Sequence, residues 1–241
     1  MIKRHSSPLA ASARLAPVLG VGSYSPAEAS RLIRMPAATV RRWLGGYSYN
    51  EDGERREVAP LWAPQLPAID DRLELGFRDL IELRFVHSLT MLGLGLNTIR
   101  QCFAYAAECV GDARPFSTNR FRTDGRSIFL DTIRNAGADE LLDLRKRQYV
   151  IKDVVEQSFK DLDFEGDAVA RWRPFDGKRS IVIDPNRSFG QPIAERYGVT
   201  TTVLAAAAEA EGSIERAAWA YELPASIVRD AVLFEQQLGA A

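Results

Sequence analysis

Two closely spaced helix-start signals constrain the fold of this chain more than any other feature. Ser25, Pro26 and Glu28 form a capping box with proline in the first helical turn. Pro36 provides the second start signal, and the glycine pair Gly45–Gly46 ends the helix that follows it. Two short helices joined by a tight turn are a helix-turn-helix. The helices are expected over residues 26–33 and 37–44.

The second of these helices concentrates side chains that suit DNA. Guanidinium groups and hydroxyls bind phosphates and base edges, while Val40 and Leu44, four residues apart, can face the core. The first 44 residues contain seven basic residues and one acidic residue, a balance that favours an anionic partner. The candidate DNA-binding residues are Arg31, Arg34, Thr39, Arg41, Arg42, Trp43, Arg55 and Arg56.

A hairpin is predicted directly after the second helix. The runs 47–49 and 58–62 are rich in aromatic and apolar residues, and they flank the polar segment 50–56, which contains a glycine. Arg55 and Arg56 lie in that polar segment. A basic hairpin that follows a recognition helix is interpreted as a wing.

Residues 24–108 resemble the winged-helix domain of MerR-type regulators. The resemblance implies that this part of the chain reads an operator. Ala37 and Ala38 replace residues that are often polar in that family, which implies that affinity depends on phosphate contacts. The residues that match are Pro36, Thr39, Arg41, Trp43, Phe77, Asp79, Leu80, Gly93, Leu96, Ile99 and Arg100.

The middle of the chain carries weaker signals. Residues 115–131 alternate around Asp124–Gly125, which predicts a second hairpin. Residues 148–159 begin as a strand or a helix and continue as a helix, and 164–178 is expected to be an irregular connector. These segments are either connection and core or, if an extended arm grasps a partner, a binding segment. The partner-binding candidates are Arg171, Trp172 and Arg173.

The C-terminal part predicts a small β-ribbon followed by helices. Two short β-runs, 179–185 and 190–193, precede a second helix-turn-helix spacing. From Lys178 onward there are six basic and eight acidic residues, so the charge argues against DNA as the partner here. An apolar stripe on the last helix is core or a dimer seam. The helices are expected over 200–210, 214–221 and 225–238, and the stripe is Ile227, Ala231, Phe234 and Leu238.

Residues 179–238 resemble a small helix-turn-helix module of bacterial antitoxins, and the whole chain resembles the longer VapB-type antitoxins. This resemblance implies a cognate PIN-domain ribonuclease (VapC-type) as toxin partner and repression of a shared operon. The Gly-Thr-Arg of that family is replaced by residues 196–199, so the contacts of its arginine do not carry over. The matching residues are Ile181, Ile183, Asp184, Pro185, Gly190, Pro192, Ile193, Glu211, Gly212, Ser213, Glu215, Ala218, Tyr221, Leu223, Val228, Ala231 and Phe234.

The alternative is a stand-alone MerR-like regulator with a C-terminal dimerisation or sensory module; a neighbouring nuclease gene favours the antitoxin and a bound metabolite favours the regulator. Both predict a cytoplasmic homodimer.

No enzyme, cofactor or metal site is expected: His5 lies in the arm, His87 on an apolar helix, and Cys102 and Cys109 are expected to be buried. The fold class is mainly α with small β-hairpins. The predicted units are a flexible basic arm (1–22), a MerR-like winged helix-turn-helix domain (23–110), a hairpin, helix and connector (111–178) and an antitoxin-like module (179–241).

Overall fold

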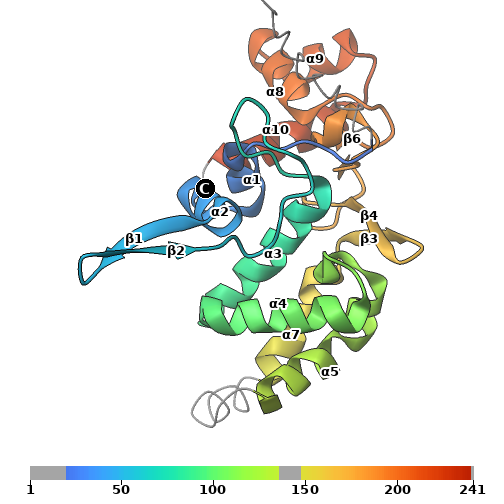
Figure 1. The fold of residues 1–241 in the computed structure, drawn as a ribbon. Helices are drawn as coiled ribbons and strands as arrows, with labels where there is room; N and C mark the ends of the chain where they lie inside the picture. Colours follow the sequence, from blue (N-terminus) through green and yellow to red (C-terminus); the bar gives the residue numbers. More distant parts are fainter. Residues whose placement is uncertain (1–19, 136–147, 240–241) are drawn as a thin grey trace, which may run out of the picture.

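The computed structural model describes residues 20–135 and 148–239, so most of the predicted arm lies outside the described residues. The fold is mainly helical with small antiparallel strand pairs, as the sequence predicts (Figure 1). Within these ranges no helix is long and apolar enough to cross a membrane. The elements are α1 (Pro26–Ile33), α2 (Ala37–Gly45), β1 (Tyr47–Glu51), β2 (Glu54–Val58), α3 (Phe77–Met91), α4 (Leu96–Val110), the 3₁₀ turn η1 (Pro115–Ser117), α5 (Asn119–Asn135), α7 (Gln148–Phe159), β3 (Leu162–Glu165), β4 (Ala168–Trp172), β5 (Ile181–Val182), the 3₁₀ turn η2 (Ser188–Gly190), β6 (Ile193–Ala194), α8 (Thr201–Ala210), α9 (Ile214–Ala220) and α10 (Ala225–Gly239).

Helix α1 begins at the capping box that the sequence predicts. The Glu28 amide donates to Ser25 Oγ at 3.3 Å, and the Ser25 amide donates to Glu28 Oε2 at 2.8 Å. The helix ends at Arg34, whose left-handed backbone (φ 62°, ψ 48°) turns the chain into Pro36 and α2. Proline suits this N-cap because its φ is already fixed near the value that helix entry requires.

The hairpin after α2 forms, but its turn is shorter than predicted. Strands β1 and β2 pair antiparallel with Glu51 opposite Glu54, so the turn contains only Asp52 and Gly53. Both turn residues have positive φ (52° and 81°), the conformation that tight hairpin turns require and that Asp and Gly tolerate. The residues that follow Val58 leave the ladder. Leu61 and Trp62 are buried in the core instead.

The predicted second hairpin at 115–131 is wrong, because this segment forms η1 and the helix α5. Thr118 Oγ1 accepts the Phe121 amide at 3.1 Å and so caps the new helix. Phe121 and Phe129 then face Phe85 and Phe159 in a cluster of aromatic rings with centroids 5.3–6.3 Å apart. The Asp124–Gly125 pair lies inside the helix, because burial of this aromatic face outweighs the local turn preference.

Residues 164–178 are not an irregular connector throughout, because β3 and β4 pair antiparallel here. Their short turn contains Gly166 at φ 65°. Residues 148–159 are helical from the start, as α7. Cys102 is buried as expected, but Cys109 is exposed.

The C-terminal part contains the predicted ribbon and helices. Strands β5 and β6 pair antiparallel, and α8, α9 and α10 pack around a second apolar core that contains Leu204, Ala217 and Val228. The last helix also lies against α1 (Figure 1), where Arg31 and Glu235 form an ion pair at 3.0 Å. The buried Tyr24 hydroxyl donates to the Gly190 carbonyl at 2.7 Å. The N-terminal helices are thereby joined to the C-terminal part.

Candidate nucleic-acid interface

Four arginines lie exposed on α1, its C-cap and α2, and three of them, Arg34, Arg41 and Arg42, have no acidic partner among the described residues. Arg34 and Arg41 form no ion pair with any acidic side chain that the structure describes. The Arg42 guanidinium lies 4.4 Å from the Tyr47 ring centroid, so a cation–π contact with the first strand orients it. The turn between the two helices and the surface of α2 thus offer unneutralised positive charge. Arg31 differs, because Glu235 binds it.

The single acidic residue of these two helices is engaged elsewhere. Glu28 closes the capping box and also accepts a hydrogen bond from Gln191 Nε2 at 3.1 Å. Its carboxylate is therefore held at the start of α1, beside the C-terminal part of the chain. Glu28 therefore does not neutralise the arginines on the surface of α2.

Trp43 lies on the opposite side of α2 from the arginines. It is only 7% exposed and packs with Val40 and Leu44 in the main core. It is therefore removed from the candidate DNA contacts. Thr39 is half-buried near the start of the helix.

The β1–β2 hairpin extends away from the helices (Figure 1), but it is not basic. Residues 47–58 contain four acidic residues and two arginines. Arg55 lies 3.9 Å from Glu57, and Arg56 lies 3.3 Å from Glu51. Both pairs are exposed to solvent, where an ion pair is weak and exchangeable. The two arginines are accessible to an anion only if they leave these glutamates.

Arg100 fixes the base of the hairpin. Its guanidinium donates to the main-chain carbonyls of Pro60 and Ala59, each at 2.8 Å, just after β2 ends. The Leu61 amide also donates to the Trp43 carbonyl at 2.7 Å, which ties the same segment to α2. Helix α4 therefore positions the hairpin relative to α2.

A buried carboxylate joins the segment after the hairpin to α3. Asp79 is fully buried and accepts hydrogen bonds from Trp62 Nε1 at 3.1 Å, the Gln65 amide at 2.6 Å and the Gly76 amide at 3.0 Å. Arg114 neutralises it at 2.7 Å. A buried charge of this kind is stable only because it is paired and fully hydrogen-bonded.

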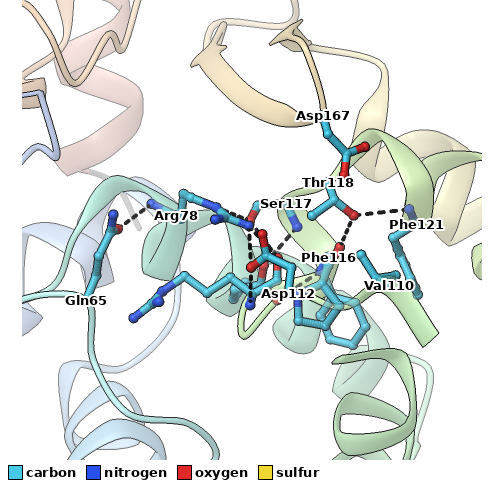
Figure 2. Close-up of polar contacts among 12 residues, drawn as sticks. Gln65, Arg78, Val110, Asp112, Phe116, Ser117, Thr118, Phe121 and Asp167 are labelled. Carbon is cyan, nitrogen blue, oxygen red and sulfur yellow. Dashed lines mark hydrogen bonds and ion pairs between the residues drawn. The ribbon is translucent and has the colours of Figure 1, made fainter. Parts of the chain in front are cut away.

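A second polar network lies beside it on α3 (Figure 2). Arg78 donates to Ser117 Oγ at 2.8 Å and pairs with Asp112 at 2.9 Å. Glu82, one turn further along α3, accepts the amides of Phe116 and Ser117. Burial raises the pKa of Glu82 to about 8, against the opposing effect of the hydrogen bonds from η1 and of Arg78. These contacts fix α3 against η1 and α5.

The signal for these two networks in the sequence is a pair of acids, Asp79 and Glu82, among the apolar residues at the start of this helix. An acid at an apolar position of a helix needs a buried partner. The partners, Arg114 and the amides of η1, are more than 30 positions away. No local pattern identifies them.

The candidate partner-binding segment has contacts within its own chain. Trp172 is 4% exposed and donates from Nε1 to Asp161 at 3.0 Å. Arg171 pairs with Glu165 at 2.9 Å, and Arg173 pairs with Asp163 and Glu195, each at 2.8 Å. These ion pairs raise the pKa of Arg173 and lower that of Glu195. The segment braces the β3–β4 hairpin against the C-terminal part. Trp172 is buried and so is not available to a partner, while a partner contact by Arg171 or Arg173 stays a prediction.

Comparisons with known proteins extend over almost the whole chain. No protein-family model matches it. A protein of Mycobacterium tuberculosis (strain ATCC 25618 / H37Rv) named "Putative antitoxin VapB45" is 26% identical over 226 residues, which are 87% of this chain and 92% of that protein. The crystal structure of Rv2018 from Mycobacterium tuberculosis matches with a TM-score of 0.69 at 22% identity, over 87% of this chain and 96% of that chain. The chain is thus a distant homologue of a protein named as a VapB antitoxin and shares its fold with a solved structure.

Proposed function

We propose that this chain is a DNA-binding antitoxin of a type II toxin–antitoxin pair. It acts in the cytoplasm as a homodimer, represses its own operon, and neutralises a partner ribonuclease of the PIN class. The observation that carries the DNA-binding part is the unpaired positive charge of Arg34, Arg41 and Arg42 on two helices joined by a tight turn. The antitoxin part is supported by the name of the distant relative.

In the proposed complex, α2 is the recognition helix of a winged helix-turn-helix of the MerR-like kind. Its exposed arginines contact phosphates and guanine edges in the major groove. The β1–β2 hairpin is the wing, and Arg55 and Arg56 exchange their glutamate partners for phosphates when DNA is present. Arg100 supports this arrangement by holding the wing at a fixed position relative to α2.

The experiment that tests DNA binding measures the affinity of the full chain for the DNA directly upstream of its own gene. The double variant Arg41→Ala/Arg42→Ala is expected to bind this DNA about tenfold or more weakly. The slope of log K against log salt concentration should also become less negative by about 0.9 for each phosphate that the variant no longer neutralises.

The matched control removes the same charge from the C-terminal helices. Arg216 and Arg229 are exposed and only loosely paired with Glu211 and Glu215, at 3.7 Å each. The variant Arg216→Ala/Arg229→Ala should retain the affinity and salt slope of the wild-type chain. An equal decrease in affinity in both double variants would mean that non-specific charge, and not α2, binds the DNA.

A further inference from the structure

Trp219 is the most exposed large apolar side chain among the described residues. It lies on α9 and is 84% exposed, whereas the other three tryptophans are 7% exposed or less. The neighbouring Ala217 and Ala218 are buried, so the inner face of α9 is already occupied by the second core. Tryptophan is highly buried on average, and it is enriched among the residues that contribute most of the binding energy at protein interfaces. The exposed ring is available to a partner outside the described chain.

A groove adjoins the Trp219 ring, lined also by Tyr197, Leu223 and Pro224. The backbone around it is fixed: Ser213 Oγ caps α9 by accepting the Arg216 amide, and the Leu223 amide donates to the Ala218 carbonyl at 2.8 Å. A protruding aromatic ring and a hollow of apolar and aromatic side chains therefore lie side by side on one rigid surface.

One charged residue of each sign lies in the lining of the groove or directly beside it in the sequence. Glu222 lines the groove, and Arg196 precedes the groove residue Tyr197. Both are exposed, and neither forms an ion pair or a side-chain hydrogen bond with any residue in the described ranges. The two charges are thus available to an external partner.

We propose that the Trp219 surface, defined as Arg196, Tyr197, Trp219, Glu222, Leu223 and Pro224, binds the same surface of a second copy of this chain. A two-fold interface uses one patch twice, so the patch must be complementary to itself. This patch meets that requirement, because it contains a knob and a hollow and both signs of charge. In the dimer, Trp219 of each copy enters the groove of the other and Arg196 faces the other copy's Glu222.

The position of the surface fits the proposed function. This inference rests on that function in one respect, namely that a helix-turn-helix that reads two half-sites requires a dimer. Helices α8 and α9 lie at the end of the molecule away from the β1–β2 hairpin (Figure 1). Pairing through α9 leaves α2 and the hairpin of both copies uncovered. The proposal therefore assigns DNA binding and dimerisation to separate surfaces.

The first test is sedimentation equilibrium of the full chain and of Trp219→Ala, with acrylamide quenching of tryptophan fluorescence at the same concentrations. Trp219 is the single exposed tryptophan, so quenching reports on it directly. The wild-type chain is expected to be dimeric, with quenching that increases as dilution separates the copies. Trp219→Ala should weaken the dimer on the order of tenfold or more and keep the thermal midpoint of the monomer fold.

The second test is a charge reversal. Glu222→Arg alone and Arg196→Glu alone should each weaken the dimer, because they place like charges opposite each other. The double variant Glu222→Arg/Arg196→Glu restores opposite charges across the two-fold axis and should recover the wild-type dimer. Recovery in the double variant is not expected if either side chain has only a structural role.

A monomeric wild-type chain, or a dimer that Trp219→Ala leaves intact, overturns the proposal. A second result also overturns it: Trp219 is quenched equally at all protein concentrations and becomes shielded only when the product of the adjacent open reading frame is added. The surface would then bind the toxin and not a second copy of this chain. None of these outcomes decides DNA binding or toxin neutralisation. Those are measured separately with the α2 variants and by co-expression.

Discussion

Arg34 has two roles whose requirements differ. As the C-cap of α1 it adopts φ 62°, a conformation that costs a side chain with a Cβ atom roughly 1 kcal/mol. As an exposed, unpaired cation beside α2 it is a proposed phosphate contact. The sequence shows the helix end before Pro36 but not the left-handed backbone, because neither glycine nor asparagine occupies this position.

Replacing Arg34 with glycine should separate the two roles. Arg34→Gly is expected to raise the free energy of unfolding by up to about 1 kcal/mol, because glycine adopts positive φ without a steric penalty. The same variant should bind the upstream DNA several-fold more weakly. Urea denaturation and fluorescence anisotropy measure the two effects, and Arg34→Asn is the control that also tolerates this backbone. Undiminished DNA affinity in both variants would show that Arg34 is a cap residue only.

Glu82 should make stability depend on pH. Its pKa is raised from about 4.5 in an unfolded chain to about 8 in the fold by burial. The folded state therefore binds more protons than the unfolded state between these values, so the contribution of Glu82 to stability is full below about pH 4.5 and is lost as the pH rises towards 8. The unfolding free energy of the wild-type chain relative to Glu82→Gln should fall by a few kcal/mol from pH 5 to 8.5.

The control for this pH dependence is Glu108→Gln, which changes an exposed glutamate on the neighbouring helix α4. Its stability difference from the wild-type chain should stay flat over the same pH range. A flat difference for Glu82→Gln as well would contradict the burial of an ionisable carboxyl at this position.

At the scale of elements, the clearest error of sequence reasoning is the segment 115–131. The Asp-Gly pair and the alternation predict a hairpin, yet α5 forms because Phe121, Ile128 and Phe129 share one helical face and are buried. Gly125 also permits close packing, since an added Cβ would lie 3.0 Å from the Phe121 ring. The aromatic residues that cover this face come from α3, η1 and α7, and their positions are decided by the tertiary fold. By contrast, α1, α8 and α10 carry their end signals locally and form where predicted.

The hairpin β1–β2 should depend on Arg100 for its position. Arg100→Ala removes both hydrogen bonds to the Ala59 and Pro60 carbonyls. Amide hydrogen exchange in residues 54–61 is expected to become faster, and affinity for the upstream DNA should fall because the hairpin is no longer held beside α2. Arg120→Ala is the matched control, because Arg120 also donates to a main-chain carbonyl, that of Val110, but far from the hairpin. Equal exchange in the wild-type chain and Arg100→Ala would mean that the Leu61–Trp43 bond fixes the hairpin alone.

At the scale of the whole molecule, the sequence predicts the division of charge better than the identity of the contacts. Of the basic residues before residue 45, the four that the structure describes (Arg31, Arg34, Arg41 and Arg42) lie on α1, its C-cap and α2, away from α8 and α9. Of the individual site residues, Arg34, Arg41 and Arg42 are exposed, Trp43 and Trp172 are in the core, and the hairpin arginines face glutamates. Helical periodicity correctly places Val40 and Leu44 towards the core, but it does not decide on which side the adjacent Trp43 lies, because the apolar stripe of a nine-residue helix is short.

The central claim is that this chain neutralises a toxin encoded beside it. The most direct measurement is growth of cells that express the adjacent open reading frame alone, with the wild-type chain, or with Arg41→Ala/Arg42→Ala. We expect growth arrest by the adjacent product alone and full relief by both forms of this chain, since α2 is assigned to DNA, together with a stoichiometric complex on purification. An adjacent product that is harmless alone and does not co-purify with the chain would contradict the antitoxin assignment and leave a stand-alone regulator.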